Sequence, residues 1–462
     1  ILEDGEIPGV ETIDAVGFFA EHKLDYPRPT CGEDLCAHAL LGVAGNLLTG
    51  ANCTLVQIGL NSPLNPAEIA RPPLDLVIAL DTSGSMRGEP IDYVRRGLTR
   101  MLTVLEPEDT VSLVVYADQA VVLIEDGTVT EREALEAAID RVTARGATNI
   151  HDGLFVAFQL ADARRAPGRE ARVMLLSDGV ATAGLEQRER LQALAEGYAR
   201  RGVGLTAVGV GTEFDIDLMR TLGEVGAGNF YFLENPAAVE EVFEEEINTF
   251  LVPVALDVEM DLVVGAGYEV RRAYGTQGWR GGLHSGQVRV PSLFLAGRRR
   301  ASDPVEGGRR GGGGGILVEL MPVSDEVDPA QADRVGRLSL RWTDPGTGER
   351  LSQVTDITNP HAPGVIPAGG WFTHGTVEKG FVMLNLLVGF QMAASLTEDG
   401  DVGSALGVLE TLRENVKAWL DGQEDPDADI ADDLRYVDLF LANLRRVGAT
   451  EVRRPPEPWP VD

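Results

Sequence analysis

The sequence predicts a multi-domain protein in which a doubly wound α/β domain is inserted into a β-sandwich and followed by a C-terminal helical region. Apolar strands alternate with amphipathic helices from about residue 73 to residue 252, which is typical of a mostly parallel sheet covered by helices. The apolar period then changes to two as far as about residue 360, and longer helical patterns follow. A chain of 462 residues is also too long for one hydrophobic core.

The first domain, residues 1–72, is expected to supply one helix and two strands to the sandwich. Residues 10–22 have the spacing of a short amphipathic helix, and an aromatic Tyr-Pro element follows at residues 24–29. Residues 38–48 and 53–61 have the composition of strands. Because these strands precede the α/β domain and the other sandwich strands follow it, the α/β domain is predicted to be an insertion.

Three cysteines lie close together in this first domain: Cys31, Cys36 and Cys53. An odd number forbids complete pairing. We expect one disulfide and one free or intermolecular thiol, most simply with Cys53 joined to Cys31 or Cys36. A zinc site is the alternative, with His38 as the candidate fourth ligand.

Residues 73–252 carry the α/β pattern. The predicted strands are residues 74–80, 110–117, 120–125, 172–177, 203–211 and 229–232. Only two residues separate the second strand from the third, so these two form a hairpin that places an antiparallel strand at the sheet edge. Helical patterns fill the intervals at residues 91–105, 131–143, 154–164, 186–201 and 237–250.

The turn after the first of these strands has the composition of a cation site. Asp81, Ser83 and Ser85 place one carboxylate and two hydroxyls at the carboxyl end of a buried strand, where open α/β sheets bind their ligands. Alternate positions on an extended turn can converge their oxygens on one point. Oxygen ligands of this kind suit Mg²⁺, Ca²⁺ or Mn²⁺.

Two later segments complete a recognisable pattern. Thr148 lies in a Gly-Ala-Thr-Asn-Ile loop before a helix, and Asp178 follows the buried strand at residues 172–177. With Asp81, Ser83 and Ser85, they resemble the metal-ion-dependent adhesion site (MIDAS) of von Willebrand factor type A (VWA) domains. The resemblance implies that Ser83, Ser85 and Thr148 offer hydroxyls to the metal, and that Asp81 and Asp178 bind it directly or through water.

Such a site is suited to recognition. Two carboxylates leave one divalent cation nearly neutral, and an exchangeable position can then accept a Glu or Asp carboxylate from a protein partner. The motifs contain no pair of nucleophile and base, so we do not expect an enzyme. His151 is the nearby titratable residue, and its place at a helix start favours a packing or surface role.

Beyond the α/β domain, residues 253–370 have the alternation of a β-sandwich. The predicted strands are residues 254–264, 287–295, 316–321 and 336–342. The glycine-rich stretch at residues 307–315 lacks the Lys-Ser/Thr pair of a phosphate-binding loop, which argues against nucleotide binding.

Residues 371–450 are predicted to form a helical domain, with helices at 377–396, 402–421 and 430–447. The longest apolar run, residues 381–390, contains Asn385 and favours a buried helix over a transmembrane segment. The acidic run Asp425-x-Asp427-x-Asp429 lacks the glycine and closing glutamate of a calcium loop, so a solvated linker is expected. Residues 451–462 form a Pro-rich tail.

Charge limits the classes of partner. Lys and Arg number 40 against 72 Asp and Glu, for a net charge of −32, which argues against nucleic acid and anionic membrane surfaces. The acidity is suited to keeping a secreted surface soluble. The chain begins at Ile1 without an initiator Met, which indicates a processed form or a fragment.

The leading hypothesis is therefore an extracytoplasmic, metal-dependent protein-binding or adhesion module. The helix and Tyr-Pro element before the metal motif are similar to those of a bacterial subfamily of secreted or lipid-anchored VWA proteins, which implies a secreted, cell-surface or periplasmic location. Two alternatives stay open. One is a structural subunit of a surface filament or sheath, assembled from copies of the chain. The other is an accessory VWA subunit of an ATP-driven machine.

Overall fold

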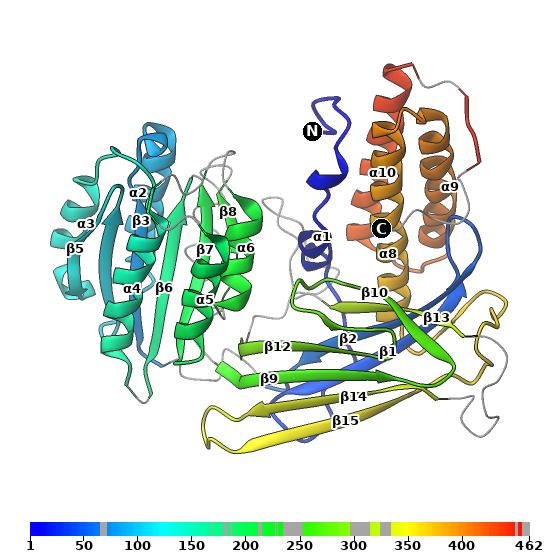
Figure 1. The fold of residues 1–462 in the computed structure, drawn as a ribbon, viewed down its shortest axis with the longest axis horizontal. Coiled ribbons are helices and arrows are strands. Elements are labelled where there is room, and N and C mark those ends of the chain that lie inside the picture. Colours follow the sequence, from blue (N-terminus) through cyan, green and yellow to red (C-terminus); the bar gives the residue numbers. More distant parts are fainter. Residues whose placement is uncertain are drawn as a thin grey trace.

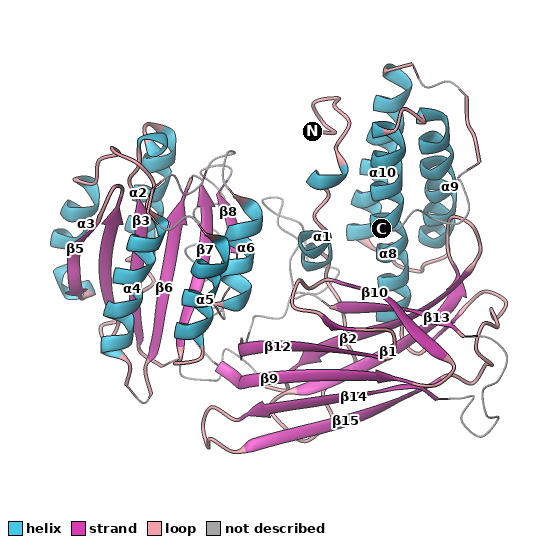
Figure 2. Cartoon of the chain, viewed as in Figure 1, coloured by secondary structure: helices cyan, strands magenta, loops and turns pink. Residues whose placement is uncertain are grey.

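The computed structural model describes residues 1–64, 72–166, 168–178, 183–184, 187–210, 215–226, 228, 230–233, 253–295, 315–323, 334–448 and 451–454. An α/β unit lies on one side of the molecule (Figure 1). Two further sheets lie on the other side, with three long helices above them. Figure 2 shows the same arrangement by secondary structure, with helices on both faces of the α/β sheet.

The α/β sheet has six strands in the order β5-β4-β3-β6-β7-β8. All neighbours are parallel except β4 and β5, so the hairpin that the two-residue connection predicts is confirmed. The strands are β3 (Leu74–Asp81), β4 (Thr110–Tyr116), β5 (Ala120–Gly127), β6 (Glu170–Ser177), β7 (Val203–Val210) and β8 (Phe230–Leu233).

Helices cover both faces of this sheet. The first face packs against α2 (Glu89–Met101) and α3 (Arg132–Asp140). The other face packs against α4 (Ile150–Arg164), α5 (Arg188–Ala199) and α6 (Ile216–Val225). Every residue of β3 is buried, because alternate side chains enter the two cores and leave no face for solvent. This strand ends at Asp81 in the middle of the sheet.

The remaining strands form two five-stranded sheets, β10-β13-β2-β1-β16 and β11-β12-β9-β14-β15, that share one apolar core. Strands β1 and β2 come before the α/β sheet in sequence, and they pair with β16 and β13, which come after it. The strands are β1 (Cys36–Gly45), β2 (Asn52–Asn61), β9 (Pro253–Val264), β10 (Tyr268–Tyr274), β11 (Arg280–Gly281), β12 (Ser285–Phe294), β13 (Ile316–Pro322), β14 (Arg334–Thr343), β15 (Arg350–Thr358) and β16 (Trp371–Phe372).

The helical region consists of α8 (Gly375–Glu398), α9 (Val402–Asp421) and α10 (Ala428–Arg446). Among the described helices, α8 alone is long and apolar enough to cross a membrane, and 72% of its most apolar stretch is buried inside the fold. Asn385 on this helix is buried too, and its amide group bonds to the carbonyl of Phe381 and to the backbone N–H of Leu47.

Several sequence-based expectations are wrong in detail. The predicted helix at residues 10–22 is a short 3-10 turn, Val10–Thr12, followed by α1 (Ala15–Glu21). The chain breaks there because Asp14 caps the new helix and accepts bonds from the N–H groups of Val16 and Gly17.

Helix α6 and strands β10 and β15 were not predicted. The predicted helix at 237–250, the glycine-rich stretch up to residue 314 and most of the Pro-rich tail lie outside the described residues.

The expected disulfide partner is also wrong. Cys31 pairs with Cys36, and Cys53 is a free, buried thiol. Cys36 lies opposite Asn61 on β2, whereas Cys53 lies opposite Ala44, near the other end of β1. The length of the strand therefore separates Cys53 from the other two. Because Cys31 and Cys36 are bonded to each other and His38 bonds to Asn61, these residues do not form the alternative zinc site.

Candidate metal-binding site

The candidate site lies where β3 and β6 end at the same edge of the α/β sheet. Asp81 is the last residue of β3, and Asp178 directly follows β6, its parallel neighbour. Both side chains are buried. The carboxyl ends of neighbouring parallel strands therefore bring together two carboxylates that are 97 positions apart in the sequence.

Hydrogen bonds join these carboxylates to the serines of the turn. The backbone N–H of Ser83 donates to Oδ1 of Asp81 at 2.8 Å, which holds the turn against the end of β3. The hydroxyls of Ser83 and Ser85 lie 2.9 Å apart, and Ser85 donates to Oδ1 of Asp178 at 2.8 Å. Four of the five residues named by the sequence pattern thus form one connected group.

The fifth residue, Thr148, lies on a loop that is fastened to the same turn. The N–H of Arg145 donates to the carbonyl of Thr82 at 2.6 Å, and the N–H of Gly84 donates to the carbonyl of Gly146 at 3.0 Å. Thr148 itself is buried, and its carbonyl accepts a bond from the N–H of Ala183. The loop therefore reaches the turn through backbone contacts, whichever side chains occupy it.

Two residues support the site without belonging to the sequence pattern. The hydroxyl of Ser177 donates to Oδ2 of Asp81 at 2.7 Å. Tyr116 lies buried on the neighbouring strand β4, and its carbonyl accepts from the backbone N–H of Thr82 at 2.8 Å and from the Thr82 hydroxyl at 2.9 Å. Ser177 could have been noticed as the polar end of an apolar strand, but no sequence signal marks Tyr116.

The charges at this site are poorly stabilised by the protein alone. Burial raises the pKa of Asp178 to about 6; the hydrogen bond from Ser85 works against this shift, and the charge of Asp81 adds to it. Burial likewise raises the pKa of Asp81, against the hydrogen bonds from Ser177 and Ser83. None of the described residues forms an ion pair with either carboxylate. Burial also raises the pKa of Tyr116, and the charge of Asp81 reinforces that shift.

This donor set fits a divalent cation. Two carboxylates and three hydroxyls are oxygen ligands of the kind that Mg²⁺, Ca²⁺ and Mn²⁺ take. A cation bound between Asp81 and Asp178 would compensate the two charges that burial disfavours. In the described part of the chain, no group of three or more His, Cys, Asp or Glu residues could hold a metal, so a cation here depends on the hydroxyls as well.

His151 takes no part in this network. Its ring stacks on Phe155 one turn along α4, with ring centroids 6.1 Å apart. This arrangement agrees with the packing or surface role expected from its position at the helix start.

The family model of the von Willebrand factor type A domain matches residues 75–245. The uncharacterized protein YfbK of Escherichia coli is 27% identical over 221 residues, which cover 47% of this chain and 37% of YfbK. The uncharacterized protein sll0103 of Synechocystis is 30% identical over 176 residues, which cover 38% of this chain and 41% of that protein. The matched part is therefore less than half of each relative.

A solved structure extends the likeness beyond the α/β domain. The von Willebrand factor type A protein from Catenulispora acidiphila aligns over 91% of this chain and 91% of its own, with a TM-score of 0.54 and 16% identity. At that level of identity the likeness concerns the fold alone. It includes the additional sheets and the C-terminal helices.

Proposed function

Residues 75–245 are a von Willebrand factor type A domain, and from this premise we propose that the chain is a metal-dependent protein-binding module. The cation would be Mg²⁺, Ca²⁺ or Mn²⁺, held by Asp81, Ser83, Ser85, Thr148 and Asp178. When bound, it would supply one exchangeable position to a Glu or Asp carboxylate of a partner. The observation that carries the proposal is the pair of buried carboxylates, joined through serine hydroxyls, that no described cationic side chain neutralises.

The protein residues have separate roles in this proposal. Asp81 and Asp178 would balance the charge of the cation, because they are the two anionic groups of the site. The hydroxyls of Ser83 and Ser85 would turn toward the cation, since the same oxygens now bond to each other and to Asp178. Ser177 would stay on Asp81 and fix the direction of its carboxylate.

We further propose an extracytoplasmic location. The Cys31–Cys36 disulfide supports it, because disulfides persist mainly in oxidising compartments. The high density of acidic side chains is compatible with a soluble, exposed surface.

A capture experiment tests the proposed function. Immobilised protein is incubated with native extract in Mg²⁺ or in chelator, and bound proteins are identified. The partner should be retained in Mg²⁺ alone. Thr148→Ala removes one ligand hydroxyl and leaves both carboxylates, so it should weaken partner affinity by roughly ten- to a hundredfold. Thr103→Ala serves as the matched control, because Thr103 is an exposed threonine beyond the far end of α2.

Two results would count against the proposal. Equal capture in Mg²⁺ and in chelator would show that binding does not use the cation. Equal capture by Thr148→Ala and Thr103→Ala would show that the loop is no part of the binding site. If a second copy of the chain is the partner, size-exclusion chromatography will show an assembly that chelator dissolves.

A further inference from the structure

Helix α1 lies between the VWA domain and the three C-terminal helices (Figure 1). It is only seven residues long, and each of its ends contacts a different part of the molecule. In its middle, Phe19 is fully buried in the core that the C-terminal helices share, and its ring lies edge-on to Tyr274 of β10. The middle of the helix is therefore fixed to the helical side of the molecule.

The first end of α1 contacts the VWA domain. The carboxylate of Asp14 accepts hydrogen bonds from the N–H groups of Val16 and Gly17, so it caps the helix. The same carboxylate forms an ion pair with Arg220 of α6. The Asp14 side chain is 32% exposed and that of Arg220 is 11% exposed. This link is within reach of solvent and salt, which weaken such pairs.

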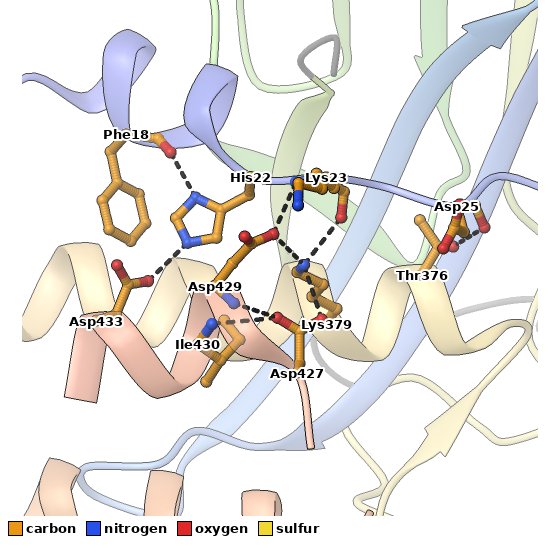
Figure 3. A network of polar contacts seen from close by, with 10 residues as sticks. All are labelled: Phe18, His22, Lys23, Asp25, Thr376, Lys379, Asp427, Asp429, Ile430 and Asp433. Carbon is orange, nitrogen blue, oxygen red and sulfur yellow. Dashed lines mark hydrogen bonds and ion pairs between the residues drawn. The ribbon is translucent and has the colours of Figure 1, made fainter. Parts of the chain in front are cut away.

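The second end is held by a buried polar group (Figure 3). The ring nitrogens of His22 each lie 2.6 Å from an oxygen, Nδ1 from the carbonyl of Phe18 and Nε2 from Oδ2 of Asp433 on α10. A carbonyl only accepts, so Nδ1 donates to Phe18, and Nε2 lies within hydrogen-bond distance of the carboxyl group of Asp433. The His22 and Asp433 side chains are both buried.

The residue after His22 adds further bonds at this end, and we call the contacts of His22 and Lys23 with Asp429, Asp433 and Lys379 the anchor. The backbone N–H of Lys23 donates to Oδ2 of Asp429 at 3.0 Å, and its carbonyl accepts from Nζ of Lys379 at 2.9 Å. Lys379 also pairs with Asp427 and Asp429, each at 2.8 Å, so its three N–H bonds are all in use (Figure 3). Releasing this end would break the bonds of His22 to Asp433 and of Lys23 to Asp429 and Lys379, all at buried groups, which is unfavourable.

Among the described residues, the other contacts between the VWA domain and the rest of the chain are small, and Phe294 of β12 packs against the apolar core of the α/β sheet. The guanidinium of Arg172 lies over the ring of Phe294 on β12, with 4.5 Å from its carbon to the ring centroid. The hydroxyl of Thr221 donates to the side chain of Gln277 at 3.0 Å. Domains joined by small contacts move relative to one another unless another link restrains them.

We infer that residues 14–23 form a connecting element that fixes the orientation of the VWA domain on the sheets and C-terminal helices. The ion pair of Asp14 and Arg220 is its releasable end, and His22 and Lys23 are its permanent end. This inference goes beyond the proposed binding function and does not depend on metal. Breaking this one partly exposed ion pair would let the VWA domain, and with it the sheet edge that carries Asp81 and Asp178, change orientation while α1 stays in place.

Distance measurements between spin labels test this inference. The labels are attached at Gln159→Cys on α4 and Lys417→Cys on α9, which are both exposed. The native cysteines are disulfide-bonded or buried and do not compete for the label. The parent protein should give one narrow distance distribution. Asp14→Asn keeps the helix cap but loses the ion pair, so it should at least double the width of the distribution.

A second variant and a control make the result specific. Arg220→Gln breaks the same ion pair from the other side, so it should broaden the distribution as Asp14→Asn does, and the double variant should add nothing. Arg200→Gln is the matched control, because it breaks the exposed pair of Arg200 and Glu196 within α5 and should leave the distribution narrow. Parent-like distributions for both Asp14→Asn and Arg220→Gln would overturn the inference.

The permanent end is tested by hydrogen exchange. His22→Ala should speed amide exchange across residues 15–22 by at least tenfold and broaden the distance distribution as well. Asp433→Asn alone, with His22 in place, should keep exchange slow, because an asparagine amide can donate to a neutral Nε2 without a charge. Slow exchange in His22→Ala would show that His22 does not hold the helix, and its assignment to the permanent end would be wrong.

Discussion

Asp178 at the edge of the VWA sheet and Asp429 at the start of α10 are both buried carboxylates, yet their pKa values move in opposite directions. Burial raises the pKa of Asp178 to about 6, against the hydrogen bond from Ser85. Burial acts on Asp429 in the same sense, but the hydrogen bond and charge of Lys379 outweigh it and lower the pKa. The difference comes from the neighbours, since Asp429 faces an ammonium group and Asp178 faces hydroxyls and a second carboxylate.

This comparison distinguishes an anchor from a binding site. The group around Asp429 contains its own cation and uses it to join α8, α10 and the chain after α1. The group around Asp178 supplies oxygen ligands without a cation of its own among the described residues. We therefore expect the first group to contribute stability and the second to cost stability until a cation binds.

Removing the internal cation should have the largest effect. Lys379→Met leaves Asp427 and Asp429 buried without their counter-charge, so the free energy of unfolding should fall by about 3–5 kcal/mol. Lys417→Met is the matched control on an exposed site and should change it by about 0.5 kcal/mol or less. Chemical denaturation checks both variants. Equal stability of the two would mean that Lys379 is not the cation that holds this group.

The two groups should respond oppositely to pH in chelator. A carboxyl group with a raised pKa stabilises the fold below its unfolded value, and this contribution is lost as pH rises through the folded value. For Asp178 the window runs from 3.8 to about 6, and the contribution is at most about 3 kcal/mol. Asp429 has a lowered pKa, so its contribution is present above 3.8 and is lost as pH falls through the folded value.

Amide exchange at different pH values measures each region separately. Between pH 4 and 6.5 in chelator, β3 should exchange faster as pH rises, after correction for intrinsic rates, whereas α10 should not. Parallel behaviour of both elements would contradict the comparison.

Replacing Asp178 or Asp429 by asparagine should change the stability of the protein in opposite directions. Asp178→Asn removes a charge that burial disfavours, and its oxygen still accepts from Ser85, so stability in chelator should rise by about 1–2 kcal/mol. Asp429→Asn removes a partner of Lys379 and should lower stability. Thermal unfolding in chelator checks both. A loss of stability in Asp178→Asn would show that its charge is already compensated.

The smallest effect is expected from Ser177→Ala. This change removes one hydrogen bond to Asp81 and should lower stability by about 1 kcal/mol. Because Ser177 supports a ligand without being one, cation affinity should fall less than it does in Asp81→Asn. Calorimetric titration of both variants makes the comparison, and an equal loss would make Ser177 a ligand.

Part of the candidate site was predictable from sequence because its residues follow a strand. A buried apolar strand fixes where its last residue lies, and the spacing of Asp81, Ser83 and Ser85 places three oxygens in one turn. Thr148 and Asp178 were added only by the resemblance to VWA domains, because the sequence does not show that β3 and β6 are neighbours. Ser177 was visible only as the polar end of an apolar strand, and no sequence signal marks Tyr116.

The anchor was not predictable, and its acidic run was misread. Asp425-x-Asp427-x-Asp429 was expected to be a solvated linker, but Asp429 is fully buried and Asp427 caps α10. Their cation, Lys379, lies about fifty residues earlier, within an apolar helix. Local composition cannot show which distant lysine enters a core, and the same limit explains the wrong partner for Cys53.

Calorimetric titration of Mg²⁺ into the metal-free protein at pH 7 tests the central claim most directly. The wild type should bind one cation per chain, whereas Asp81→Asn and Asp178→Asn should bind at least tenfold more weakly, and Asp178→Asn should remain folded throughout. Equal Mg²⁺ binding by all three proteins would show that the two buried carboxylates do not hold the cation.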